Sequence, residues 1–221
     1  MSCYWDPRFL KHITCDVKTI VEVGARYGDE SLILSNTFKD ARVFSFECNP
    51  FTIDKCKHNL ENIPNITFTP KGLGEKNEFL PFYSYTDNND GASSFLKRID
   101  AETTQVQSGV FEVIRLSDFA REHRITTIDL LCMDVQGFEL NVLKGCIDGD
   151  LIQNIKYIIM EEPKPVINLE YLPDNVHSKY LNSPTSAEIK SFMTENDFII
   201  IEQVEENKIE DNVMYKNTLF L

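Results

Sequence analysis

The sequence is poor in positive charge and has no long apolar run. It has 22 lysines and arginines against 35 aspartates and glutamates, and its net charge is −13. Proteins that bind a phosphate backbone carry a basic face, so this balance argues against nucleic acid and against an anionic membrane surface as partners. No run approaches the ~20 apolar residues of a membrane span, and the first residues lack the basic start and apolar core of a signal peptide. We therefore expect a cytoplasmic protein that binds neither nucleic acid nor membrane.

Signatures of disulfides, metal sites and repeats are also missing. The six cysteines form no C-x-x-C pair. Cys132 lies in an apolar run and Cys146 follows a predicted helix, which is typical of small core residues in a reducing compartment. The 221 residues suit one domain, 1–221, in which 1–18 form an N-terminal cap and 163–184 form an irregular loop that covers the active site. We predict no metal site, and the oligomeric state stays open.

A strand-turn-helix unit spans residues 128–145. An apolar run ends near Asp134, a turn follows at Gln136-Gly137, and a helix begins at Glu139 and stops at Gly145. In open α/β sheets, ligands bind at the carboxyl ends of the strands. Asp134 is therefore a candidate site residue, although an aspartate at this position can also serve only to cap the turn or the helix.

A second unit of this kind lies near the N-terminus. A predicted strand at 20–23 runs into a Gly24-x-x-x-Gly28 turn, and the following strand, 43–47, ends in an acid. Glu47 comes 23 residues after Gly24, the placement of an acid that hydrogen-bonds a ribose diol. The turn is not the G-x-G-x-x-G fingerprint. A cofactor with a ribose is therefore indicated, and a nucleotide-dependent oxidoreductase stays open as an alternative.

The rest of the chain alternates between predicted strands and helices. Further strands are predicted at 66–69, 79–83, 110–116, 157–162, 198–204 and 214–221, and helices at 29–38, 50–60, 117–123 and 185–196. The last two strands form a hairpin. This alternation predicts an α/β fold with one doubly wound sheet and a C-terminal hairpin. The polar stretch 86–94 is either a disordered tip or a ligand-binding loop.

Three of these segments resemble a known family. Val21-Glu-Val-Gly-Ala-Arg-Tyr-Gly28 is similar to the first motif of class I S-adenosylmethionine-dependent methyltransferases, and Phe46-Glu-Cys-Asn-Pro50 to the second. Residues 128–145 are similar to the signature of the FkbM family within that class. The resemblance extends from about residue 18 to 162. It implies a Rossmann-like sheet of seven strands, mostly parallel with an antiparallel last strand, and O-methylation of a sugar, a glycan or a small-molecule natural product.

The resemblance also implies a set of residues that bind S-adenosylmethionine. These are Glu22, Gly24, Ala25, Gly28, Glu47, Cys48, Asn49, Gly72, Leu73, Ser93, Ser94, Asp134 and Gln136. Glu22 and the glycines are expected at the methionine end, Glu47 at the ribose, and Gly72 and Leu73 near the adenine. The chain departs from the family at Gln136, where a glutamate is usual. A scaffold that binds the cofactor without catalysis is therefore a further alternative.

Four residues are candidates for the chemistry. Asp134, at a strand end beside the expected ligand crevice, is the predicted base or hydroxyl orienter. Glu161 and Glu162 end the next apolar strand and are candidates to hold sugar hydroxyls. His177 is a second candidate base if the 163–184 loop folds over the site, although a histidine in such a loop can equally be a surface residue. The expected acceptor is a small molecule or a glycan.

Overall fold

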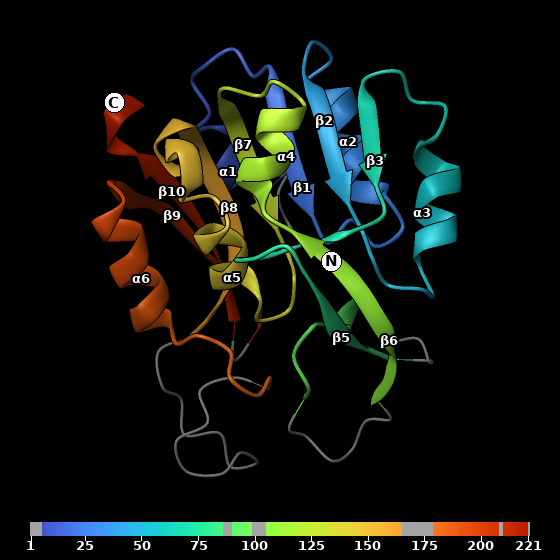
Figure 1. Cartoon of the computed structure of the whole chain (residues 1–221). Coiled ribbons are helices and arrows are strands. Elements are labelled where there is room, and N and C mark those ends of the chain that lie inside the picture. Colours follow the sequence, from blue (N-terminus) through green and yellow to red (C-terminus); the bar gives the residue numbers. More distant parts are fainter. Residues whose placement is uncertain (1–5, 86–89, 99–104, 165–178, 208–209, 221) are drawn as a thin grey trace.

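The structure is a computed structural model that describes residues 6–85, 90–98, 105–164, 179–207 and 210–220. Its centre is a seven-stranded sheet with the order β3-β2-β1-β7-β8-β10-β9 (Figure 1). The strands are β1 (Thr19–Val23), β2 (Arg42–Phe46), β3 (Ile66–Thr69), β7 (Ile128–Met133), β8 (Ile155–Pro163), β9 (Phe198–Glu205) and β10 (Glu210–Asn217).

All neighbours in this sheet are parallel except those of β10, which is antiparallel to both β8 and β9. The order steps outward in both directions from β1, because the chain builds β2 and β3 on one side and β7 and β8 on the other. This arrangement confirms the Rossmann-like, mostly parallel α/β sheet with an antiparallel C-terminal strand.

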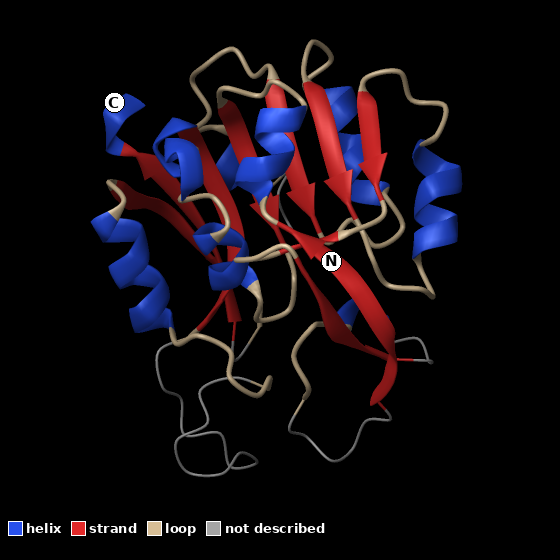
Figure 2. Ribbon diagram, in the orientation of Figure 1, coloured by secondary structure: helices blue, strands red, loops and turns tan. Residues whose placement is uncertain are grey.

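Helices cover both faces of the sheet (Figure 2). They are α1 (Pro7–Leu10), α2 (Asp29–Thr37), α3 (Ile53–Leu60), α4 (Leu116–Glu122), α5 (Glu139–Lys144) and α6 (Ser186–Glu195). Successive side chains of a strand point to opposite faces. In β7, Leu131 and Met133 therefore join the core beneath α4, α5 and α6, while Leu130 and Cys132 join the core beneath α1 and α2. Burial on both faces explains why this strand is an unbroken apolar run.

Local sequence signals account for two of the helix ends. Thr185 and Glu188, whose spacing is that of a capping box, form one at the start of α6, each side chain hydrogen-bonded to the backbone of the other. Gly145 ends α5 as expected, but for another reason. Its φ is −69°, so no left-handed cap is required. A Cβ at Gly145 would instead lie 2.1 Å from the carbonyl oxygen of Gly74, so close packing explains this glycine.

A second sheet corrects the expectation of a single one. It has the order β4-β6-β5 and is built from β4 (Gly72–Leu73), β5 (Glu78–Tyr85) and β6 (Gln105–Ile114). The predicted strands at 79–83 and 110–116 both belong to it. The small sheet lies below the carboxyl ends of the parallel strands in Figure 1.

Several predicted boundaries were wrong. Strand β6 begins at Gln105 and ends at Ile114, and the buried Leu116 already opens α4. Helix α3 starts at Ile53 rather than at Pro50, and β10 runs from Glu210 to Asn217 instead of 214–221.

In the helix predicted at 29–38, the sequence pattern favours Leu32, Ile33 and Leu34 on the inner face, and this was partly wrong for α2. Leu34 is buried in the core as expected, whereas Leu32 is only partly buried and Ile33 lines a cavity. In the described parts of the chain, no helix is long and apolar enough to cross a membrane.

Candidate active site

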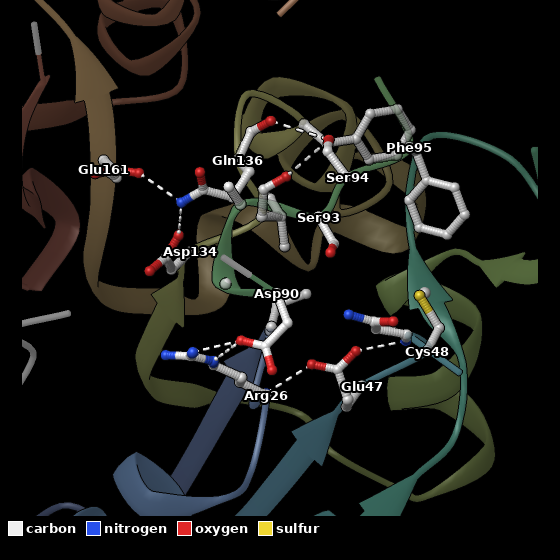
Figure 3. Close-up of a pocket in the computed structure, with 18 of the residues that line it drawn as sticks. Arg26, Glu47, Cys48, Asp90, Ser93, Ser94, Phe95, Asp134, Gln136 and Glu161 are labelled. Atoms are coloured by element: carbon white, nitrogen blue, oxygen red, sulfur yellow. Dashed lines mark hydrogen bonds and ion pairs between the residues drawn. The ribbon is translucent and has the colours of Figure 1, made fainter. Parts of the chain in front are cut away.

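A cavity of about 830 Å³ opens at the carboxyl ends of the parallel strands. The turns after β1, β2 and β7, the end of β8 and the short loop around Asp90–Phe95 line it. Figure 3 shows the polar side chains of these elements gathered around the same space. The topology explains this gathering, because parallel strands bring their carboxyl ends to one edge of the sheet.

Glu47 follows β2 and presents a buried carboxylate to the cavity. Its Oε2 accepts a hydrogen bond from the backbone N–H of Arg26 at 2.6 Å, and its Oε1 accepts one from the N–H of Asn49 at 2.6 Å (Figure 3). Burial nevertheless raises the pKa of Glu47 to about 7. Each carboxylate oxygen has a second lone pair, so Glu47 can accept two further hydrogen bonds from a diol.

Gly24 ends β1 with φ +89° and lines the cavity. A Cβ here would lie 2.0 Å from the carbonyl oxygen of Asp134. The glycine therefore allows the turns after β1 and β7 to approach each other. This contact within the protein is the constraint on Gly24 that the structure shows.

Three of the predicted cofactor residues lie behind the cavity wall. Ala25 is fully buried in a small core with Cys56 and Leu60, and a Cβ at Gly28 would meet Leu60 at 2.8 Å. Glu22 points to the other side of β1, where the hydroxyls of Ser31 and Ser45 donate hydrogen bonds to it. Its Oε1 has no hydrogen-bond partner among the described residues, and burial raises the pKa of Glu22 to about 8. None of the three lines the cavity directly.

Other predicted cofactor residues do line the cavity. They are Cys48, Asn49, Gly72, Leu73, Ser93, Ser94, Asp134 and Gln136. The side chain of Asn49 is engaged in the protein, since its Oδ1 accepts from the N–H of Phe51 and the hydroxyl of Ser84. The hydroxyl of Ser94 donates to the carbonyl of Gln136 at 2.9 Å and so ties the 90–95 loop to the turn after β7.

Asp134 and Glu161 face each other across Gln136 (Figure 3). The side-chain amide of Gln136 donates to Asp134 Oδ1 at 2.6 Å and to Glu161 Oε2 at 3.0 Å. The hydroxyl of Tyr180 lies 2.7 Å from Gln136 Oε1, which fixes the amide in the orientation that directs its nitrogen at both acids. One amide nitrogen with two hydrogens thus bridges two carboxylates.

Burial and neighbouring carboxylates raise the pKa of both carboxyls. Desolvation raises the pKa of Asp134 to about 6, against the hydrogen bond from Gln136, which lowers it. Desolvation and the neighbouring Asp134 raise the pKa of Glu161 well above its usual value. A titratable pair with raised pKa values in a cavity is typical of a site that moves protons.

The sequence interpretation missed the ion pair of Arg26 and Asp90. The guanidinium of Arg26 donates to Asp90 Oδ1, with Nε at 2.9 Å, and the hydroxyl of Tyr27 also donates to Asp90. These contacts fasten the loop after β1 to the short 3-10 turn Asp90–Ala92. Since the partners are 64 residues apart, no spacing pattern pointed to the pair.

One of the expected acceptor-side residues, Glu162, does not line the cavity. It points to the opposite face of β8, where the hydroxyl of Tyr215 donates to it. The expectation that Glu162 holds sugar hydroxyls there is therefore corrected. His177 lies outside the described residues. From the same 163–184 segment, Lys179 and Tyr180 line the cavity.

The chain is similar to several known proteins. Residues 22–200 match the model of the methyltransferase FkbM domain. "Methyltransferase 1" of Beauveria bassiana is 29% identical over 161 residues, which cover 63% of this chain and 64% of that protein. The hexuronic acid methyltransferase AglP of Haloferax volcanii is 24% identical over 180 residues, 81% of this chain and 68% of that one. The chain thus spans about two thirds of the length of these curated relatives.

A solved structure agrees in fold. The crystal structure of a methyltransferase FkbM from Methylobacillus flagellatus superposes with a TM-score of 0.53 at 16% identity, over 91% of this chain and 44% of that one. The sheet order and the antiparallel β10 give the chain the Rossmann-like fold that this solved methyltransferase shares. The chain belongs to the FkbM methyltransferase family. The cofactor of that family is S-adenosylmethionine.

Proposed function

We propose that the protein is an S-adenosylmethionine-dependent O-methyltransferase that acts on a hydroxyl of a sugar or glycan. The observation that carries the proposal is the pair of raised-pKa carboxyls, Asp134 and Glu161, held by Gln136 in the cavity that also contains Glu47. The hexuronic acid methyltransferase among the relatives supports a carbohydrate acceptor.

The residues of the cavity fit the cofactor. Glu47 has two buried acceptor oxygens with free lone pairs, as the ribose hydroxyls require. The turn after Gly24 and the acids next to it suit the cationic methionine end, and Gly72 and Leu73 give the adenine an apolar border. When bound, S-adenosylmethionine supplies a methyl group on a sulfonium, which is electrophilic enough to react with an oxygen nucleophile.

Asp134 is the proposed base. With a pKa of about 6 it is largely ionised at neutral pH, yet it binds a proton more tightly than an ordinary aspartate. Its place in the turn after β7, next to Gly24, supports this role, because the strand order sets it between the proposed cofactor residues after β1 and β2 and the proposed acceptor side over β8. Asp134 would take the proton from the acceptor hydroxyl while Glu161 orients the ring.

Replacing Asp134 with asparagine tests the base assignment. Asp134→Asn keeps the size of the side chain and an acceptor oxygen for Gln136 but removes the basic group. We expect turnover to fall by roughly 100-fold or more, the scale of lost general-base catalysis, while the affinity for S-adenosylhomocysteine stays near that of the parent. Glu122→Gln, an exposed change on α4, is the control. A variant as fast as the parent would refute the assignment.

An acceptor panel tests the substrate class. Methyl transfer is measured with monosaccharides, nucleotide sugars, oligosaccharides and small phenols, with and without a chelator. Activity on phenols alone would contradict the sugar proposal and favour a natural-product acceptor. Loss of activity with the chelator would indicate a metal requirement. Cofactor binding without transfer to any acceptor would favour the non-catalytic scaffold, and calorimetric binding of NAD in place of S-adenosylmethionine would favour the oxidoreductase.

A further inference from the structure

The cavity continues past Asp134 along the edge of the sheet. Neighbouring strands follow the order β2, β1, β7, β8, β10, so the cofactor residues Glu47 and Gly24 lie at one end and Glu161 lies beyond Asp134. We name the far part the acceptor end. Six of the residues that line it are Glu161, Lys179, Tyr180, Glu206, Glu210 and Asn212. Asn212 pairs with Glu161 in the β8–β10 ladder, so the two strands form one continuous wall.

The acceptor end is negatively charged. Glu161, Glu206 and Glu210 line it together with Lys179, and Asp134 adds a fourth carboxyl at its border. The charges that act most strongly on Glu161 are other carboxylates, namely Asp134, Glu210, Glu139 and Glu206. Glu139 is mostly uncharged at neutral pH, because burial raises its pKa to about 8.

In the described part of the chain, two cations near the acceptor end, Lys164 and Arg98, contact other groups. Lys164, at the end of the same wall, contacts Glu205 at 2.8 Å and Asp211 at 3.5 Å. The guanidinium of Arg98 lies over the rings of Tyr85 and Tyr180, 5.6 Å from each centroid. Among the described residues that we assign to the acceptor end and its border, Lys179 is therefore one cation beside four carboxyls, those of Asp134, Glu161, Glu206 and Glu210.

Part of this negative charge lies on the oxygens of Asp134 and Glu161 that Gln136 does not contact. Gln136 occupies Asp134 Oδ1 and Glu161 Oε2. Within the described residues, Asp134 Oδ2 and Glu161 Oε1 accept no hydrogen bond, and both side chains line the cavity. A carboxylate in a place of reduced solvation gains most from a donor that also carries positive charge. An anionic group here would be repelled by all of these acids.

We infer that the acceptor carries a protonated amine next to the hydroxyl that is methylated, as in an amino sugar. This inference rests on the proposed function and narrows its substrate class. An ammonium group has three donors and one positive charge, which matches the spare oxygen of Glu161 with Glu210 beside it, while the spare oxygen of Asp134 is left for the neighbouring hydroxyl. The methionine end of the cofactor does not account for these acids, because Glu161, Glu206 and Glu210 lie over β8 and β10, beyond Asp134.

A matched set of ligands tests the inference by binding alone. Glucose, glucosamine and glucuronate share the ring and differ in charge, and each is titrated into the protein saturated with S-adenosylhomocysteine. We expect glucosamine to bind about ten-fold or more tightly than glucose, and glucuronate to bind most weakly. Equal affinities for glucosamine and glucose, tighter binding of glucuronate, or no binding of glucosamine would overturn the inference.

A charge-neutral variant localises the effect. Glu210→Gln removes the charge but keeps an acceptor oxygen for the side-chain amide of Asn207, which donates to Glu210 Oε2 at 2.8 Å in the parent. It is expected to lower the preference for glucosamine over glucose several-fold, and Glu122→Gln, outside the cavity, to leave it unchanged. An unchanged preference in Glu210→Gln would also count against the inference. Methyl transfer to neutral sugars without preference for an amine would reject the inference and uphold the proposed function, whereas failure to bind S-adenosylhomocysteine would reject the proposed function itself.

Discussion

At the scale of single residues, the main feature of the cavity is a set of buried and half-buried acids. Glu47, Asp134 and Glu161 all have raised pKa values. Backbone N–H groups donate to Glu47, and the Gln136 amide donates to the other two. A glutamate in place of Gln136 would set three carboxyls side by side and remove the donor that both acids share. The glutamine is therefore an integral part of the pair as this chain builds it.

Glu47→Gln tests the ribose assignment. The amide keeps the shape of the side chain, but one of its two acceptor oxygens becomes a donor, which cannot accept from a backbone N–H or from a ribose hydroxyl. We expect the affinity for S-adenosylhomocysteine, measured by calorimetry, to weaken by about 1–3 kcal/mol, the scale of hydrogen bonds to a charged group. The control is again Glu122→Gln. Unchanged affinity in Glu47→Gln would remove this residue from the cofactor site.

At the scale of elements, the site depends on how closely the turns after β1 and β7 meet. Gly24 touches the backbone of Asp134, and the N–H of Asp134 donates to the carbonyl of Val23 at 3.1 Å. Glu139, the first residue of α5, accepts from the N–H of Val135 at 3.0 Å and so holds the same turn from the other side. The position of the proposed base thus follows from backbone contacts between two elements.

Gly24→Ala should therefore displace Asp134 as well as strain the backbone. The added Cβ meets a carbonyl oxygen at 2.0 Å, which no side-chain movement can relieve. Gly149 is a matched control, because its φ is also positive, +67°, but a Cβ there has nothing within 4 Å.

We expect Gly149→Ala to lose only the ~1–2 kcal/mol of left-handed strain, and Gly24→Ala to lose more stability and to bind S-adenosylhomocysteine poorly. Denaturant unfolding and calorimetry measure the two effects. Equal destabilisation by the two substitutions would show that the close approach of Gly24 to Asp134 contributes nothing to stability.

At the scale of the whole molecule, the buried carboxyls link stability to pH. Glu22 and Glu139 have pKa values of about 8 in the folded protein, against an ordinary value of 4.5. Between these values the folded state binds more protons than the unfolded state, so stability falls as pH rises from about 4.5 to about 8 and levels off above that. The half-buried Glu202, whose pKa is lowered to about 2 by its contacts with Lys11 and His12, acts only below this window.

The melting temperature should accordingly be higher at the acidic end of this window than at its alkaline end. Glu139→Gln keeps an acceptor for the N–H of Val135 but cannot ionise, so it should flatten the profile by on the order of 1 kcal/mol or more, given about 1.4 kcal/mol for each pKa unit. Thermal unfolding of parent and variant across the window measures this. A melting temperature that rises steadily from acid to alkali in the parent would contradict the expectation.

The sequence by itself determined the fold class, the family and most of the strands of the large sheet. Buried strands such as β7 are apolar runs, and the glycine turn, the acid at Glu47 and the 128–145 segment are local patterns that need no knowledge of contacts. The capping box at Thr185 is of the same kind. Local chemistry fixes local conformation, which is why these features could be predicted.

Only the tertiary structure decided what meets in the cavity. Strand β4 has two residues, too few for any periodicity, and it pairs with β6 some forty residues away, so the second sheet left no clear pattern in the sequence. The pairs Arg26 with Asp90 and Gln136 with Glu161 join residues 64 and 25 positions apart. Such contacts depend on the order of the strands and on backbone approach, as at Gly24, and a linear pattern records neither.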